Sequence, residues 1–108
     1  MANQFGEKIR HLREANHLLQ RQVASLMEID TPMLSKLERG ERKAKKEQVF
    51  LFAKILKANK EELLTIWLAD QVLEVVQNEA LALQAMHLAE IEVKYNSKQK
   101  AQHLPNVV

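Results

Sequence analysis

Residues 20–40 read QRQVASLMEIDTPMLSKLERG, and this stretch decides the fold. Apolar residues at helical spacing, Val23, Ala24 and Met27, predict a short helix over about residues 20–28. The pattern restarts at Thr31-Pro32, so one long helix does not fit. Two short helices joined by about three residues are typical of a helix-turn-helix.

The second of these helices carries clear start and stop signals. Pro32 is tolerated in a first turn because the N–H that it lacks would be unbonded there. A residue that precedes proline is restricted in conformation, which favours Thr31 as the N-terminal cap, with Asp30 as the alternative. Leu34 and Leu37 then face inward, and Gly40 ends the helix.

Helical spacing continues on both sides of this stretch. The sequence predicts further helices over about residues 3–16, 46–57, 59–77 and 79–95. No stretch of five or more residues alternates between apolar and polar side chains, so no sheet is expected. The fold class is therefore all-α.

The second half of the chain is expected to extend a five-helix domain. Asn59 with Glu62 forms an N-x-x-E capping pattern. The helix that follows is apolar on more than one face, which predicts burial on two sides, and Trp67 is interpreted as a core residue. We expect a helix-turn-helix domain over residues 1–69, a helical extension over residues 70–95 and a polar tail over residues 96–108.

Composition limits the functions of this 108-residue chain. The absence of cysteine excludes disulfides and thiol chemistry, and it suits a reducing cytoplasm. No apolar run reaches the ~20 residues of a membrane helix, so no membrane contact is expected. No glycine-rich phosphate loop or carboxylate–histidine cluster is present, so we expect neither an enzyme nor a cofactor. No metal site is expected, because the histidines are scattered: His11, His17, His87 and His103.

Charge separates the two halves of the chain. Residues 1–58 hold 12 Lys and Arg against 7 Asp and Glu, whereas residues 59–108 hold 4 against 7. Six of the basic residues follow or belong to the second helix of the helix-turn-helix: Lys36, Arg39, Arg42, Lys43, Lys45 and Lys46. A wide major groove admits one helix while the helix before it braces against the phosphates, so this placement favours a double-stranded DNA partner.

These residues resemble the phage-repressor-like XRE helix-turn-helix family. The resemblance covers about residues 5–68, and Leu34-Ser35-Lys36-Leu37-Glu38-Arg39-Gly40 is its most specific part. The resemblance is closer to the regulators found beside DNA methyltransferase and restriction genes than to phage repressors proper. Glu28 stands where the family usually has a turn glycine, and Leu19 stands where Ser or Thr often caps the second helix.

The resemblance implies roles for individual residues. Gln20 would hydrogen-bond a phosphate at the start of the second helix, and Arg21 is expected at the DNA beside it. Base edges would be read by Thr31, Pro32 and Lys36, with Met33 and Ser35 at the margins, and phosphates would be met by Arg39, Arg42 and Lys43. The chemistry agrees, because a lysine can donate to guanine O6 and N7 and carbon atoms can contact a thymine methyl group.

Arg13 and Glu38 lie on otherwise inward-facing helical surfaces. Two independent surface charges would explain them. A partly buried ion pair between the first and third helices is the sharper interpretation, and the resemblance supports it because the family often pairs these positions.

Three functions remain open on the sequence. The first is a sequence-specific transcriptional regulator, a repressor by resemblance, that binds a palindromic operator as a homodimer. The second is an antitoxin-type autorepressor that also binds a partner protein, and the third is a helical protein-interaction adaptor.

Residues 70–95 are the candidate dimerisation element, because they continue an apolar helical pattern beyond a complete domain. Its acidic residues, such as Asp70 and Glu74, would keep this end away from DNA phosphates. The alternative is that the last helix folds back onto its own domain. The residues expected at the dimer contact are Val72, Val76, Leu81, Leu88 and Ile91.

Overall fold

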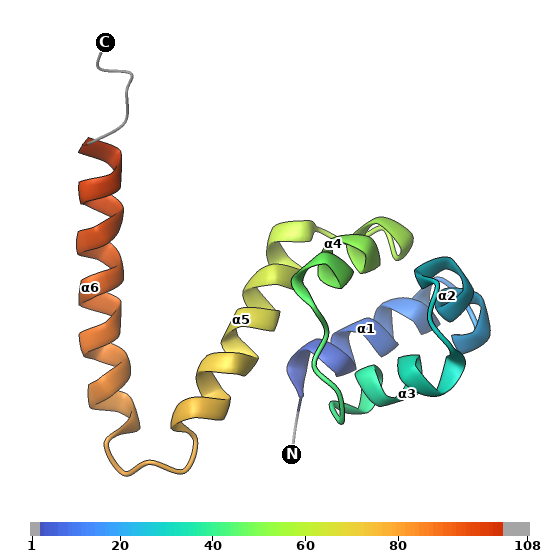
Figure 1. Cartoon of the computed structure of the whole chain (residues 1–108), viewed down its shortest axis with the longest axis horizontal. Coiled ribbons are helices and arrows are strands. Elements are labelled where there is room, and N and C mark those ends of the chain that lie inside the picture. The colour runs from blue at the N-terminus through green and yellow to red at the C-terminus, as the bar shows by residue number, and fades with distance from the viewer. Residues whose placement is uncertain (1–2, 103–108) are drawn as a thin grey trace. The chain divides into compact units, whose positions relative to one another are not determined.

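The structure is a computed structural model that describes residues 3–102, and every regular element in that range is a helix. Figure 1 shows the helices in chain order. Their bounds are α1 (Gln4–Ala15), α2 (Gln20–Met27), α3 (Thr31–Arg39), α4 (Lys46–Ile55), α5 (Lys60–Val76) and α6 (Ala82–Gln102). The all-α prediction is confirmed.

The chain forms two compact units that meet inside α5, between Leu73 and Glu74. The first unit holds α1 to α4 and most of α5. The second holds the end of α5 and α6. Each unit is described by itself below.

The core of the first unit gathers around α3, which packs against both α1 and α2 (Figure 1), while α2 also packs against α4. Phe5 and Phe52 meet edge to face, with ring centroids 6.0 Å apart. Fully burying one such apolar side chain contributes about 1.5–3 kcal/mol. The other large side chains that are fully buried are Ile9, Leu34, Leu56, Leu63, Val23 and Val49.

Helix ends follow local side-chain chemistry, with one correction to the sequence prediction. Asp30, rather than the favoured Thr31, is the N-cap of α3, and its Oδ1 accepts from the N–H of Met33 at 2.7 Å. A carboxylate at a helix N-terminus also interacts favourably with the helix dipole. This stabilisation outweighs the restriction that Pro32 places on Thr31, which adopts the first helical position.

Most of α5 is less buried than its sequence predicts. Asn59 caps it as expected, since its Oδ1 accepts from the N–H of Glu62 at 2.8 Å. Among the described residues of α5, Leu63 alone is buried, and Leu68 and Val75 are 54% and 76% exposed. The prediction of burial on two sides is wrong for a single chain, because only the first turns of α5 lie on the core.

Two side chains fasten α5 to earlier parts of the first unit. The Asp70 carboxylate accepts from the N–H groups of Phe5 and Gln4, at 2.8 and 3.2 Å. Trp67 is half-buried against the core as predicted, and its Nε1 donates to the carbonyl of Ala44 at 2.8 Å. Asp70, which the sequence assigns to the extension, therefore satisfies the N-terminus of α1.

The last helix begins three residues later than predicted and continues further. A turn over residues 77–81 precedes it, and it runs from Ala82 to Gln102. The helix passes its predicted end at residue 95 and runs through residues 96–102 of the predicted polar tail, because lysine and glutamine extend an existing helix readily. Residues 103–108 of that predicted tail lie outside the described residues.

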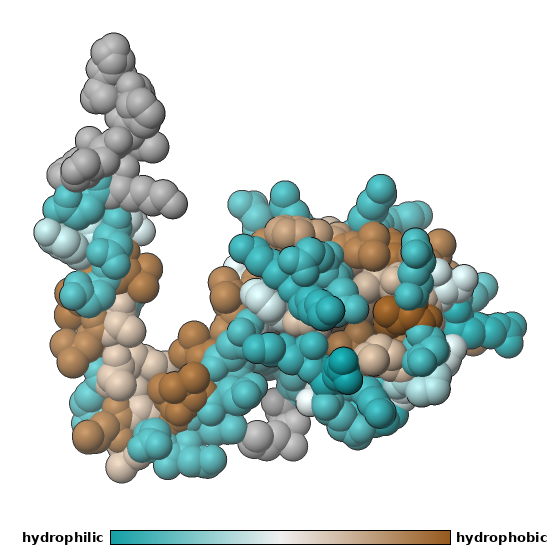
Figure 2. All heavy atoms as spheres, viewed as in Figure 1, coloured by the Kyte–Doolittle hydropathy of each residue, from teal (hydrophilic) through white to brown (hydrophobic). Residues whose placement is uncertain are grey.

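Many large apolar side chains of this second unit are exposed, and Figure 2 shows hydrophobic atoms open along it. They are Val75, Leu81, Leu83, Leu88, Ile91, Val93 and Tyr95. None of the helices within residues 3–102 combines the length and apolar character that a membrane span requires.

Candidate nucleic-acid interface

The turn between α2 and α3 depends on a left-handed residue. Glu28 has φ 58° and ψ 42°, the conformation that glycine adopts most easily. The N–H of Ile29 then donates back to the carbonyl of Ala24 at 3.0 Å, which closes the end of α2. Glutamate stands here where the resembled family usually has glycine, and it adopts this left-handed conformation itself.

The N-terminus of α2 forms without a capping side chain. Leu19 is the N-cap, and its N–H donates to Oε1 of Gln22 at 2.7 Å. This contact supplies one half of a capping box, so Gln22 partly replaces the missing serine or threonine.

The third helix has an inward and an outward side. Leu34, Leu37 and Glu38 are buried against the rest of the first unit. Met33 differs from the other predicted DNA contacts because it also packs against the hydrophobic core. The residues predicted to read base edges lie on the outward side, with Pro32 and Lys36 exposed and Thr31, Met33 and Ser35 half-buried.

Arg13 and Glu38 form a bidentate ion pair between α1 and α3. Arg13 Nε donates to Glu38 Oε2 at 2.7 Å and Nη2 donates to Oε1 at 3.0 Å. The two side chains are 12% and 2% exposed, so little water competes with the pair. The hydrogen bond to Glu38 raises the pKa of the Arg13 guanidinium above its ordinary value.

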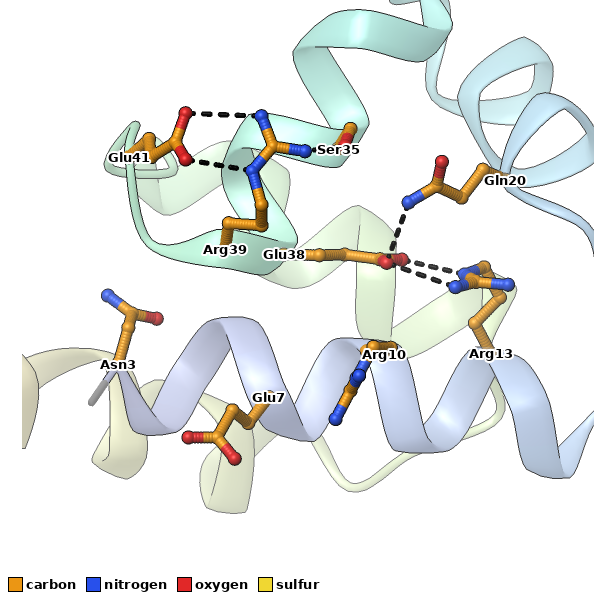
Figure 3. Close-up of a pocket in the computed structure, with 9 residues that line it drawn as sticks. All are labelled: Asn3, Glu7, Arg10, Arg13, Gln20, Ser35, Glu38, Arg39 and Glu41. Carbon is orange, nitrogen blue, oxygen red and sulfur yellow. Dashed lines mark hydrogen bonds and ion pairs between the residues drawn. The ribbon is translucent and has the colours of Figure 1, made fainter. Parts of the chain in front are cut away.

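Gln20 joins this pair from α2. Its Nε2 donates to Oε1 of Glu38 at 2.9 Å, so one of its two amide hydrogens is engaged within the protein. Glu38 thereby links three helices (Figure 3), while Arg21 beside Gln20 is exposed. A phosphate contact by Gln20 would use its backbone N–H or its remaining amide hydrogen.

Arg39 is held by its own neighbours at the end of α3. Its Nε and Nη2 donate to the two carboxylate oxygens of Glu41 at 2.8 and 3.1 Å, and Nη1 donates to Oγ of Ser35. The paired hydrogen bonds lower the pKa of the Glu41 carboxyl and raise the pKa of Arg39. Both groups are therefore charged near neutral pH.

The remaining basic residues of the loop after α3 face solvent. Arg42 and Lys43 are exposed, as are Lys45 and Lys46. Lys43 Nζ lies 3.4 Å from Oε1 of Gln71, which connects this loop to α5. The structure thus places Arg42 and Lys43 beyond the end of the third helix, where their charges are accessible.

A polar groove of about 570 Å³ runs between α1 and α3, with Gln20 of α2 at its edge. In Figure 3, Arg13, Glu38 and Gln20 meet at one end, and Arg39 meets Glu41 and Ser35 at the other. The groove brings Gln20, Ser35 and Arg39 together from the predicted DNA-contact residues. Its lining is Asn3, Glu7, Arg10, Arg13, Gln20, Ser35, Glu38, Arg39 and Glu41.

Sequence reasoning missed four residues of this groove, which are Asn3, Glu7, Arg10 and Glu41. Arg10 is exposed on α1 and adds a positive charge to the groove. Its position one turn before Arg13 was the available signal. No sequence pattern indicates that Glu41 pairs with Arg39, because that contact depends on the backbone turn at Gly40.

The described histidines do not cluster. His11, His17 and His87 are exposed, and His103 lies outside the described residues. Within residues 3–102, no group of three or more histidines or acidic residues is arranged to hold a metal ion.

The expected dimer contacts are open in the single chain. Val72, Leu81, Leu88 and Ile91 are exposed and Val76 is half-buried.

Comparison with known proteins agrees with this geometry. The model of a helix-turn-helix domain family matches residues 4–65, which is more than half of the chain. No curated protein and no solved structure gives a significant match. The matched range contains α2, the turn at Glu28 and α3, together with the helices that brace them. The chain therefore belongs to the helix-turn-helix family of DNA-binding domains.

Proposed function

We propose that this helix-turn-helix protein is a sequence-specific transcriptional regulator whose α3 enters the major groove of operator DNA. The observation that carries the proposal is the outward side of α3. Pro32 and Lys36 are exposed there, with Thr31 half-buried beside them. Leu34, Leu37 and Glu38 anchor the same helix to the protein. A rigidly held helix with polar and small apolar groups on its open side suits the readout of base edges.

The proposed contacts divide into two kinds. Lys36 donates to guanine, Thr31 and Pro32 contact thymine methyl groups, and Met33 and Ser35 lie at the margins. The phosphates bind Gln20, Arg21, Arg39, Arg42 and Lys43, which supplies affinity without sequence choice. Since Thr31 and Pro32 offer few hydrogen bonds, sequence-dependent DNA shape contributes to recognition as well.

The protein is proposed to bind as a homodimer. The supporting observation is the set of large apolar side chains left open by α6 and the end of α5, including Leu81, Leu88 and Ile91. Exposed apolar patches usually mark interfaces. A two-fold interface of this kind would match the symmetry of a palindromic operator that binds two copies of α3.

The finer classification rests on the residues quoted from the sequence. We propose an XRE-type repressor, of the sort associated with DNA methyltransferase and restriction genes, that acts in the cytoplasm where the DNA is. The run from Leu34 to Gly40 supports this classification.

Selection of bound duplexes from a random-sequence pool tests the whole proposal. We expect enrichment of one palindromic site, with half-sites separated by about one helical turn, or about 10 base pairs. Retention of the pool without enrichment would limit the protein to non-specific binding. No retention at low salt would exclude DNA as the partner.

The apolar surface of α6 also favours a second candidate function, an antitoxin-type autorepressor. In that case a partner protein covers part of this surface, such as Leu88 and Ile91. A second protein would then co-purify with the chain from its host. Recovery of the chain from its host without any second protein contradicts this candidate.

A further inference from the structure

Arg39, one of the proposed phosphate contacts, already holds a carboxylate. Three of its nitrogens donate within the protein, Nε and Nη2 to Glu41 and Nη1 to Ser35. The Nε–Nη2 edge is one of the edges by which a guanidinium binds a phosphate in two parallel hydrogen bonds. Glu41 occupies that edge.

The backbone places Glu41 opposite Arg39. Gly40 ends α3 with φ 76°, and the N–H of Glu41 donates back to the carbonyl of Lys36 at 2.9 Å. This left-handed turn brings residue 41 back beside residue 39. A side chain on Gly40 would clash with Cβ of Asn3 and would have to adopt a positive φ, so this turn requires glycine.

Glu41 is a negatively charged residue within a basic segment of the chain. Residues 36–46 hold six lysines and arginines and two glutamates, and one of those glutamates, Glu38, is buried. Glu41 is thus the exposed carboxylate of a basic segment that the proposed function places against DNA, and its side chain is 55% exposed. A DNA phosphate that approaches Arg39 would be repelled by the negative charge of Glu41, the ion-pair partner of Arg39.

We propose that Glu41 competes with DNA phosphate for Arg39 and thereby limits the affinity of the protein for DNA of any sequence. The inference rests on the proposed DNA-binding function. The competition is intramolecular, so it acts on every duplex alike and leaves base readout by α3 unaffected. Sequence preference then depends more strongly on the base contacts, because the phosphate contribution is reduced.

The variant Glu41→Gln tests this inference in the full chain. It keeps the shape of the side chain and removes its charge. The matched control is Glu61→Gln, which makes the same change in net charge at an exposed position on α5. Binding is titrated against a mixed-sequence duplex at several salt concentrations, with melting curves to verify that each variant folds.

We expect Glu41→Gln to bind about two- to fivefold more tightly at low salt, the scale of one surface ion pair. Its salt dependence should steepen by about 0.9, the value for one added phosphate contact. Glu61→Gln should match the wild type. Equal behaviour of the two variants would overturn the inference.

A second comparison separates competition from simple repulsion. In an Arg39→Gln background, the gain from Glu41→Gln should largely disappear if Glu41 acts through Arg39. A gain of the same size in both backgrounds would show repulsion of the DNA and overturn the competition. If the wild-type chain binds no duplex at any salt concentration, the proposed function itself fails, and this inference fails with it.

Discussion

Glu38 is a charged residue that lies buried inside the first unit. Its carboxylate accepts from Arg13 twice and from Gln20 once, inside the protein. The buried carboxylate would be strongly unfavourable without these hydrogen bonds. The partly buried Arg13 guanidinium would likewise be unfavourable without the counter-charge of Glu38. Glu38 therefore fixes the position of α3 against α1 and α2.

Glu38→Ala should lower the free energy of unfolding by about 3–5 kcal/mol, because the Arg13 guanidinium loses its counter-charge while remaining buried. Replacement of both residues by methionine should be much milder, since no charge is then left unpaired. Chemical denaturation of the three proteins measures this. A Glu38→Ala melt within a degree or two of the wild type would contradict the burial of the pair.

Substitution of Lys36 and substitution of Arg42 should weaken DNA binding in different ways. Lys36→Ala should cost about 1–3 kcal/mol at the selected operator and relax preference at one base pair. Arg42→Ala should weaken binding to all DNA sequences equally, and it should reduce the slope of log affinity against log salt concentration by about 0.9. Titrations on operator and scrambled duplexes distinguish them. An unchanged sequence preference in Lys36→Ala would refute its role in base readout.

Glu28 adopts a left-handed conformation that strains a residue with a side chain. Glu28→Gly should therefore leave the protein equally stable or raise its stability by up to about 1 kcal/mol, after allowing for the greater flexibility of glycine in the unfolded chain. The same change at Glu14, within α1, should lower stability by up to about 1 kcal/mol. Thermal melts compare the two; a clear loss in Glu28→Gly would show that no strain is stored there.

At the scale of elements, α1 and α3 approach each other at a glycine. A Cβ built on Gly6 would lie 2.5 Å from the carbonyl oxygen of Glu38 and 2.6 Å from that of Leu37. Backbone atoms cannot yield as a flexible side chain can, so the two helices would have to separate. The close approach also keeps Arg13 within reach of Glu38.

Gly6→Ala should destabilise the first unit by about 1–3 kcal/mol, the range for an overpacked core. Glu7→Ala, one position later on the exposed side of α1, should change stability by less than about 0.5 kcal/mol. Denaturation midpoints give both values. Equal midpoints for Gly6→Ala and the wild type would show that the helices shift apart without loss.

Helix positions were largely predictable because helical periodicity is a property of neighbouring residues. The range of α2 and the end of α3 at Gly40 needed only local patterns. The N-cap of α3 could not be predicted in this way, because Asp30 and Thr31 are both favourable N-cap residues. The hydrogen bonds that each makes in the folded chain decide between them. The hydrogen bond from the Phe5 N–H to the Asp70 carboxylate joins residues 65 positions apart, and no local sequence pattern in either segment predicts it. The pairing of Arg39 with Glu41 depends on one backbone dihedral angle.

At the scale of the whole molecule, the chain combines a well-packed unit with one whose apolar side chains remain open. Leu88 is 66% exposed, and Ile91 is 50% exposed. This exposure is unfavourable for an isolated helix in water, because each exposed apolar side chain lacks the free energy that its burial would contribute. A second copy would cover these side chains.

A chain ending at Leu73 should be monomeric and folded, whereas the full chain should be a dimer. Leu73 is the appropriate end point because it closes the first compact unit and retains Asp70. Light scattering measures the mass, and titration on a palindromic duplex should show weaker binding by the shortened chain. A shortened chain that stays dimeric would place the contact within the first unit.

The bond between Asp70 and the start of α1 also sets an order of events during synthesis. The ribosome makes α1 first, yet the N–H groups of Gln4 and Phe5 gain their carboxylate partner only after Asp70 has been added. Until then Asn3 caps α1 alone, and the N–H groups of Gln4 and Phe5 lack their carboxylate partner. Completion of the first unit is therefore deferred until translation has passed Asp70 in α5. A nascent chain interrupted before that point contains α3 without the contacts between α5 and the start of α1.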